Sequence, residues 1–133
     1  MSKTSEIKPD LKYTKDHEWV RVEGNRATIG ITDYAQDALT EVVYAELPDV
    51  GDEFKTHDSL GVVESVKSVS DIFSPLSGRV VAVNEELDDT PNLMNQDPYG
   101  KGWYCVLEIT EPSELGTLLS AEDYRRFLEE QAH

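Results

Sequence analysis

The sequence predicts a single, mostly β domain made of two small antiparallel sheets with few helices. Apolar and polar residues alternate along most of the chain, which is the pattern of half-buried strands. The length of 133 residues suits one domain, and no stretch rich in Ser, Gly and Pro divides it. Hydrophobic residues make up 38% of the chain, enough to bury a core.

The clearest strands are the first pair. Glu18–Glu23 and Arg26–Ile31 flank Gly24 and Asn25, and two such runs separated by two turn residues predict a hairpin. Five later segments also have strand composition: Val42–Leu47, Ser59–Val66, Ser68–Phe73, Arg79–Val83 and Trp103–Ile109.

Helices are expected in two places only. Asp33–Leu39 follows Thr32, which has the side chain of an N-cap. Ser120 to Asp123 resembles a capping box that opens a helix over Tyr124–Glu130. We therefore expect one domain over residues 1–133, with a flexible N-terminus at 1–10 and a helical segment at 113–130.

A weak internal similarity connects the two halves of the chain. Leu60 follows Gly51, and Leu87 follows Gly78, in each case by nine residues. Two similar halves would form a pseudo-symmetric pair of sheets, with a hairpin midway between them near Val66–Ser68.

The charge excludes two classes of partner. The chain has 12 Lys and Arg against 27 Asp and Glu, a net charge of -15, with a mean hydropathy of -0.49. Such a chain repels nucleic acid and offers no basic face to anionic lipid. No apolar stretch approaches the roughly 20 residues of a membrane span, and no apolar signal core follows Met1–Glu6, so we expect a cytoplasmic protein.

No catalytic or metal-binding set is visible. Three His residues and one Cys provide no metal-ligand spacing, and no Gly-rich loop opens a helix to hold phosphate. Cys105 lies in an apolar run, where a buried strand thiol without a chemical role is expected. Neither a metal nor an active site is predicted.

Lys67 is the most informative residue. It is the only cation between Lys55 and Arg79, and it lies at the tip of the predicted hairpin between Ser59–Val66 and Ser68–Phe73. A lysine in that position projects into solvent, although turn lysines are usually ordinary surface residues. The residues around it decide between the two interpretations.

Those residues resemble a known family. Glu64–Asp71, followed by Ser74–Gly78, resembles the lipoyl-lysine segment of the glycine cleavage system H protein family. Gly51 lies 16 residues before Lys67 and Gly78 lies 11 after it, a glycine spacing similar to that of lipoyl and biotinyl carrier domains. Further blocks at 13–19, 30–39, 47–51 and 95–103 extend the resemblance from Leu11 to Glu130. Biotin carriers would be expected to have Met where this chain has Val66 and Ser68.

The resemblance implies a fold and a function. The fold is the barrel-sandwich hybrid of lipoyl and biotinyl carriers, and the chain is a non-catalytic, monomeric swinging-arm carrier. Lipoate is joined to the side chain of Lys67 as an amide by a lipoyl or octanoyl transferase or by a lipoate ligase. Glycine decarboxylase, a pyridoxal-phosphate enzyme, loads the aminomethyl group of glycine onto the arm. An aminomethyltransferase passes the one-carbon unit to tetrahydrofolate, and dihydrolipoamide dehydrogenase reoxidises the arm.

The resemblance also implies a cleft that protects the loaded arm. By this resemblance, Asp16, Glu18 and Asp71 stand at the positions that line the cleft. Carboxylates there would favour the ammonium form of the carried amine, and an ammonium group cannot expel the thiolate. Solvated strand-end carboxylates are the alternative interpretation for these residues. His17, Trp19 and Trp103 are expected to be packing residues. The modifying enzyme would read the residues around the lysine, namely Glu64, Ser65, Val66 and Ser68.

Alternatives stay open at this stage. The chain could be a relay that donates lipoyl groups to other complexes, or an unmodified scaffold. The acidity fits docking on basic patches of partner enzymes, but it also fits a high-salt host. In addition, Thr40 stands where the family usually has Gly, so a left-handed turn there would strain the backbone.

Overall fold

The computed structural model describes residues 5–131. The strands within this range are β1 (Lys12–Tyr13), β2 (Glu18–Glu23), β3 (Arg26–Ile31), β4 (Val42–Ala45), β5 (Glu53–Phe54), β6 (Ser59–Ser65), β7 (Val69–Phe73), β8 (Gly78–Val83) and β9 (Cys105–Ile109). The helices are α1 (Asp33–Leu39), α2 (Glu86–Asp89), α3 (Leu93–Gln96), the 3-10 helix η1 (Pro112–Thr117) and α4 (Ala121–Gln131).

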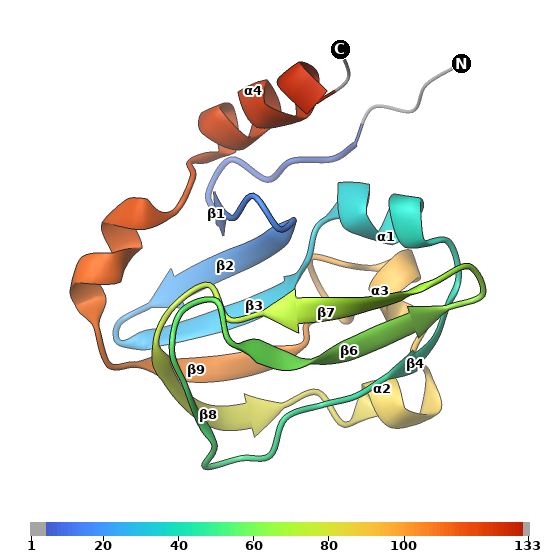
Figure 1. Ribbon diagram of the computed structural model, residues 1–133, viewed down its shortest axis with the longest axis horizontal. Helices are drawn as coiled ribbons and strands as arrows, with labels where there is room; N and C mark the ends of the chain where they lie inside the picture. The colour runs from blue at the N-terminus through green and yellow to red at the C-terminus, as the bar shows by residue number, and fades with distance from the viewer. Residues whose placement is uncertain (1–4, 132–133) are drawn as a thin grey trace.

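The strands form two antiparallel sheets, as predicted. One has six strands in the order β1-β2-β3-β9-β8-β5, and the other has three in the order β4-β6-β7. The small sheet lies in front of the large one, and the β6–β7 hairpin extends toward the side of the molecule where α1 lies (Figure 1). The mostly β class is therefore confirmed.

All seven predicted strands are present, and four of them are shorter than predicted at one end. β6 and β7 each lack the predicted residue next to the hairpin tip, Val66 and Ser68. β4 stops at Ala45 rather than Leu47, although the Glu46 N–H still donates to the Val62 carbonyl oxygen (2.8 Å) beyond the strand end. β9 begins at Cys105 rather than Trp103, whose N–H donates to the carbonyl oxygen of Gly100 in a turn (3.1 Å).

Both predicted helices are present with the predicted caps. The Thr32 hydroxyl accepts from the Ala35 N–H (3.2 Å) at the start of α1. The Ser120 hydroxyl accepts from the Asp123 N–H (3.1 Å) at the start of α4. The expectation of only two helical places was wrong, because α2 and α3 lie between β8 and β9. With four residues each, they are too short to display a helical period in the sequence.

The predicted internal repeat was also wrong. Gly51 has a φ of +100°, whereas Gly78 is an ordinary strand residue of β8. The two leucines likewise differ, since Leu60 lies in β6 and Leu87 in α2. Only the hairpin expected between the halves is present.

The main core lies between the two sheets. Both sheets contribute buried side chains, and Leu87 and Met94 from α2 and α3 close one end. A second cluster lies under α4, where Tyr13, Trp19 and Tyr124 are fully buried. Gly30 pairs with Trp19 across β2 and β3, and a Cβ at Gly30 would come within 2.6 Å of the indole ring.

The N-terminal segment contacts this second cluster. The Glu6 N–H donates to Asp33 Oδ2 (2.8 Å), and the Tyr99 hydroxyl donates to the Glu6 carbonyl oxygen (2.6 Å). The segment expected to be flexible, 1–10, therefore has tertiary contacts from Glu6 onward, and residues 1–4 lie outside the described part. Among residues 5–131, no helix has the length and apolar character needed to cross a membrane.

Candidate functional site

Lys67 lies at the exposed tip of the β6–β7 hairpin, as predicted. The Ser65 side chain fixes this tip, because its hydroxyl oxygen accepts from the N–H groups of Lys67 (3.2 Å) and Ser68 (3.0 Å). The Ser65 N–H donates to the Ser68 carbonyl oxygen (2.8 Å) and closes the turn. The backbone at the tip is thus ordered while the lysine side chain projects into solvent.

The hairpin is tied to the rest of the molecule through the α1–β4 loop. The Val66 N–H donates to the carbonyl oxygen of Glu41 (3.1 Å). Asn95 of α3 holds the residues on either side of Glu41: its amide nitrogen donates to the Thr40 carbonyl oxygen (2.7 Å), and its Oδ1 accepts from the Val42 N–H (2.8 Å). Asn95 therefore fixes the carbonyl that anchors the lysine hairpin.

Thr40, the predicted departure from the family pattern, is strained. Its φ of 67° and ψ of -156° lie in a region that is essentially reserved for Gly. The conformation lets its N–H cap α1 by donating to the Gln36 carbonyl oxygen (3.1 Å). A β-branched residue thus occupies a left-handed turn position in this chain.

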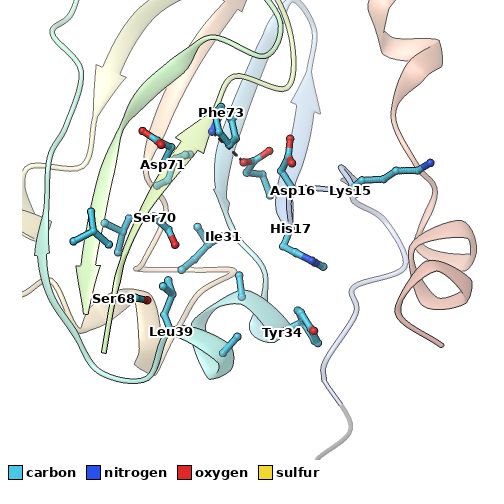
Figure 2. Close-up of a pocket in the computed structure, with 16 residues that line it drawn as sticks. Lys15, Asp16, His17, Ile31, Tyr34, Leu39, Ser68, Ser70, Asp71 and Phe73 are labelled. Carbon is cyan, nitrogen blue, oxygen red and sulfur yellow. Dashed lines mark hydrogen bonds between the residues drawn. The ribbon is translucent and has the colours of Figure 1, made fainter. Parts of the chain in front are cut away.

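A cleft begins beside the lysine and runs along β7. Its volume is about 520 Å³, and Ser68 and Val69, the residues that follow Lys67, line one end of it. Asp16, Asp71 and Phe73 lie toward the other end (Figure 2). The walls are β7, the loop before β2, and the face of α1 that carries Tyr34 and Leu39. Lys67 therefore directly precedes two residues that line the cleft.

Glu18 is buried at the inner wall of this cleft. Its side chain is 2% exposed. Oε1 accepts from the Thr14 hydroxyl (2.7 Å) and Oε2 from the Phe73 N–H (3.1 Å), so the carboxyl group joins the start of β2 to the end of β7. Burial is the main cause that raises the pKa of Glu18 to about 7.

Thr14, which the sequence analysis did not single out, shapes the loop that presents Glu18. Its hydroxyl oxygen accepts from the N–H groups of Asp16 and Glu18, both at 3.2 Å, and its own N–H donates to the Glu18 carbonyl oxygen (3.0 Å). His17 takes a φ of 68° in this tight loop. The available signal was a hydroxyl residue at the start of a polar turn between strands.

The other two predicted carboxylates, Asp16 and Asp71, are exposed at the mouth of the cleft. Asp71 Oδ1 accepts from the Ser59 hydroxyl (3.0 Å). Lys15, also part of the lining, points away toward α4 (Figure 2), with its Nζ 5.9 Å from the centre of the Phe127 ring. The structure thus brings Asp16, Glu18 and Asp71 to one acidic cleft, which suits a cationic group.

The residues predicted to pack do so. His17 Nδ1 lies 2.8 Å from the Tyr124 hydroxyl. The Trp19 indole N–H donates to the Pro98 carbonyl oxygen (2.8 Å), and Trp103 packs against the second cluster. Cys105 is buried, which raises the pKa of its thiol to about 12.

The residues around the lysine share the hairpin. Glu64 and Val69 pair across it, and Val66 and Val69 are 68% and 60% exposed. Ser65, Val66 and Ser68 form the tip with Lys67. Within residues 5–131, no group of three or more His, Cys, Asp or Glu side chains could hold a metal ion.

An ordered hairpin with a protruding lysine, built on two antiparallel sheets and next to a cleft, defines a class of protein. These are the features of a carrier domain for a covalently attached group.

Comparison with known proteins identifies the family. The family model for the glycine cleavage H-protein matches residues 11–131. A glycine cleavage system H protein of Carboxydothermus hydrogenoformans is 55% identical over 127 residues, covering 96% of this chain and 98% of that protein. One from Symbiobacterium thermophilum is 55% identical over 124 residues, covering 93% and 97%. The crystal structure of a glycine cleavage system H protein from Mycobacterium marinum superposes with a TM-score of 0.81 at 35% identity, covering 96% of this chain and 100% of that one.

The chain therefore belongs to the glycine cleavage H-protein family. Members of this family are lipoyl-carrying, non-catalytic components of the glycine cleavage system, and they work with its other proteins.

Proposed function

We propose that this chain carries lipoate on Lys67 and shuttles the aminomethyl group of glycine between the enzymes of the glycine cleavage system. The observation that carries the proposal is the continuity of lysine and cleft. Lys67 is exposed on an ordered tip, and the next two residues already line the cleft.

The residues present fit such an attached group. The side chain of Lys67 is exposed and therefore accessible to an acylating enzyme. The Ser65 hydroxyl holds the tip through backbone N–H groups and not through the lysine side chain. Ile31, Leu39 and Phe73 give the cleft apolar walls for a long aliphatic arm. When bound, the lipoyl group supplies a reactive disulfide at the end of a flexible chain.

The acidic end of the cleft then has a defined task. Glu18, Asp71 and Asp16 stabilise the ammonium form of an amine carried into it, because a carboxylate within a few ångströms favours the charged state. A protonated nitrogen has no lone pair with which to expel the cargo. The surrounding walls slow hydrolysis by limiting access of water.

The hairpin is the surface that the modifying enzyme reads. Glu64, Ser65, Val66 and Ser68 surround the lysine and present a fixed backbone with an exposed Val66 and a half-buried Glu64. A lipoyl or octanoyl transferase or a lipoate ligase would acylate Lys67 here.

The partners follow from the cycle: glycine decarboxylase with pyridoxal phosphate, the tetrahydrofolate-dependent aminomethyltransferase, and dihydrolipoamide dehydrogenase. The net charge of -15 favours rapid encounter with basic patches on these enzymes. The proposal includes a monomeric carrier in the cytoplasm.

A lipoyl relay protein is the second candidate, and an unmodified scaffold is the third. The complete acidic cleft favours glycine cleavage over a relay, because donating lipoyl groups does not need a site for an amine. A scaffold would need no modified lysine.

Mass spectrometry of the protein purified from its native cell tests the proposal. The peptide that contains Lys67 is expected to carry a lipoyl or octanoyl mass. Lys67→Arg should lose that mass, whereas Lys55→Arg, a matched change at an exposed lysine in the β5–β6 turn, should keep it. A bare Lys67 in cells that lipoylate other proteins would refute the proposed function and leave the family assignment intact.

A further inference from the structure

The C-terminal helix contacts the loop beside the cleft through the Phe127 ring and one buried hydroxyl. Tyr124 of α4 is fully buried, and its ring stacks on Tyr13 with 4.6 Å between centroids and 3° between planes. Its oxygen lies 2.8 Å from His17 Nδ1 and 2.8 Å from the Thr32 hydroxyl. These two partners belong to different segments of the chain.

Both segments border the cleft. His17 lines it directly, in the loop that also carries Asp16 and Glu18. Thr32 is the N-cap of α1, whose residues Tyr34, Ala35 and Leu39 line the facing wall. The Thr32 N–H also donates to the His17 carbonyl oxygen (3.0 Å), so the Tyr124 hydroxyl closes a small network between the two walls.

The two contacts fit an assignment of protons in which each hydroxyl donates once. In it, the Thr32 oxygen accepts from the Ala35 N–H and its proton goes to Tyr124, while the Tyr124 hydroxyl donates to Nδ1 of a neutral His17. Burial agrees with this arrangement, because it lowers the pKa of His17 and raises that of Tyr124.

We propose that Tyr124 is a positioning residue for the cleft: its hydroxyl holds the His17 loop against the start of α1 and so sets how long the carrier retains its cargo. The inference rests on the proposed function of the cleft. His17 has a φ of 68°, an unfavourable conformation that the contacts around the loop have to hold. The helix that supplies the restraint comes from the far end of the sequence.

The test measures cargo lifetime. Lipoylated protein is loaded by glycine decarboxylase with glycine labelled at its methylene carbon, separated from the enzyme, and followed for release of labelled formaldehyde. Tyr124→Phe keeps the stacked ring and removes the hydroxyl. Release is expected to become about five- to tenfold faster, the factor that corresponds to losing the one hydrogen bond by which Tyr124 holds the His17 loop.

Tyr13→Phe is the matched control. Tyr13 is equally buried and belongs to the same stacked pair, but its hydroxyl donates to the Lys8 carbonyl oxygen, away from the cleft. The cargo lifetime of lipoylated Tyr13→Phe should equal that of the lipoylated protein without a substitution. The ¹⁵N shift of His17 Nδ1 should move in Tyr124→Phe and stay unchanged in Tyr13→Phe, which a general loss of stability would not produce.

A second pair of variants keeps the test informative if Tyr124→Phe folds poorly. Asn and Gly both tolerate the positive φ of residue 17, but only Asn offers an oxygen where Nδ1 stood. His17→Asn should retain cargo longer than His17→Gly. Equal lifetimes for Tyr124→Phe and Tyr13→Phe, or for His17→Asn and His17→Gly, would overturn the inference. If the lipoylated protein without a substitution retains cargo no longer than free lipoamide does, the proposed function of the cleft fails instead.

Discussion

Replacing Glu18 by Gln should stabilise the protein at alkaline pH. Burial raises the pKa of this carboxyl from 4.5 to about 7. An acid with a raised folded pKa binds more protons when folded, so the stability it contributes is present below pH 4.5 and is lost as the pH rises through about 7. At about 1.4 kcal/mol per pH unit, this interval corresponds to roughly 3 kcal/mol.

Gln keeps the shape of Glu18 and carries no charge at any pH. Its amide oxygen can accept from the Phe73 N–H, but its amide nitrogen cannot accept the Thr14 proton, and the Thr14 oxygen already accepts from two N–H groups. The loss of the Thr14 bond offsets about 1 kcal/mol of the gain. The net gain in the free energy of unfolding is therefore about 2 kcal/mol at pH 8, with a small loss at pH 4.5.

Urea unfolding at pH 4.5 and pH 8 measures the free energy of unfolding of both proteins. An unchanged slope of this free energy against urea concentration is the check that only stability differs. Asp71→Asn is the control, because it replaces an exposed carboxyl group of the same cleft by an amide. A stability difference for Glu18→Gln that stays constant between the two pH values would refute the argument that burial sets the ionisation of Glu18.

Three further predictions concern other parts of the molecule. Thr40→Gly should raise the free energy of unfolding by about 1 kcal/mol, which is the relief of an unfavourable φ less the entropy that Gly adds to the unfolded chain. Thr40→Ala keeps a Cβ and should gain less. Equal urea midpoints for the two variants would contradict this prediction. Asn95→Ala should lower the free energy of unfolding by about 2 kcal/mol, because the buried Val42 N–H loses its acceptor. The same variant should speed hydrogen exchange at the Val66 amide. Asn92→Ala, at an N-cap without a side-chain bond, should have neither effect. Native Cys105 should resist a thiol reagent at pH 8 and react only after unfolding, as followed by absorbance; rapid labelling of the folded protein would contradict its burial.

Most of the fold could be predicted because its elements have strong local signals. Alternation marked all seven longer strands, and hydroxyl caps marked the starts of α1 and α4. The two-residue strands and four-residue helices could not be predicted, because tertiary contacts rather than a pattern define them. Leu87 and Met94, for instance, show their role only once the sheets are in place.

The site could be predicted only in part, for a different reason. Lys67 was visible from its place in a hairpin and from the family resemblance. Local sequence did not predict that Glu18 is buried while Asp16, two residues earlier, is exposed, because that difference depends on β7 approaching from 55 residues away. The contribution of Tyr124 depends on a contact across 107 residues, for which the sequence has no signal.

The unfavourable features of the chain gather around the cleft, and they are of two kinds. Glu18 and His17 lie in its wall, where a buried carboxyl and a positive φ set the charge and the shape of the cleft. Thr40 is strained as well, but its side chain lies outside the cleft, and a Gly would hold the same turn. Glu18→Gln should therefore gain stability and shorten cargo lifetime, whereas Thr40→Gly should gain stability and leave cargo lifetime unchanged. If both variants shorten the lifetime, the α1–β4 loop belongs to the cargo site; if neither does, the carboxyl group of Glu18 is a structural link between β2 and β7 alone.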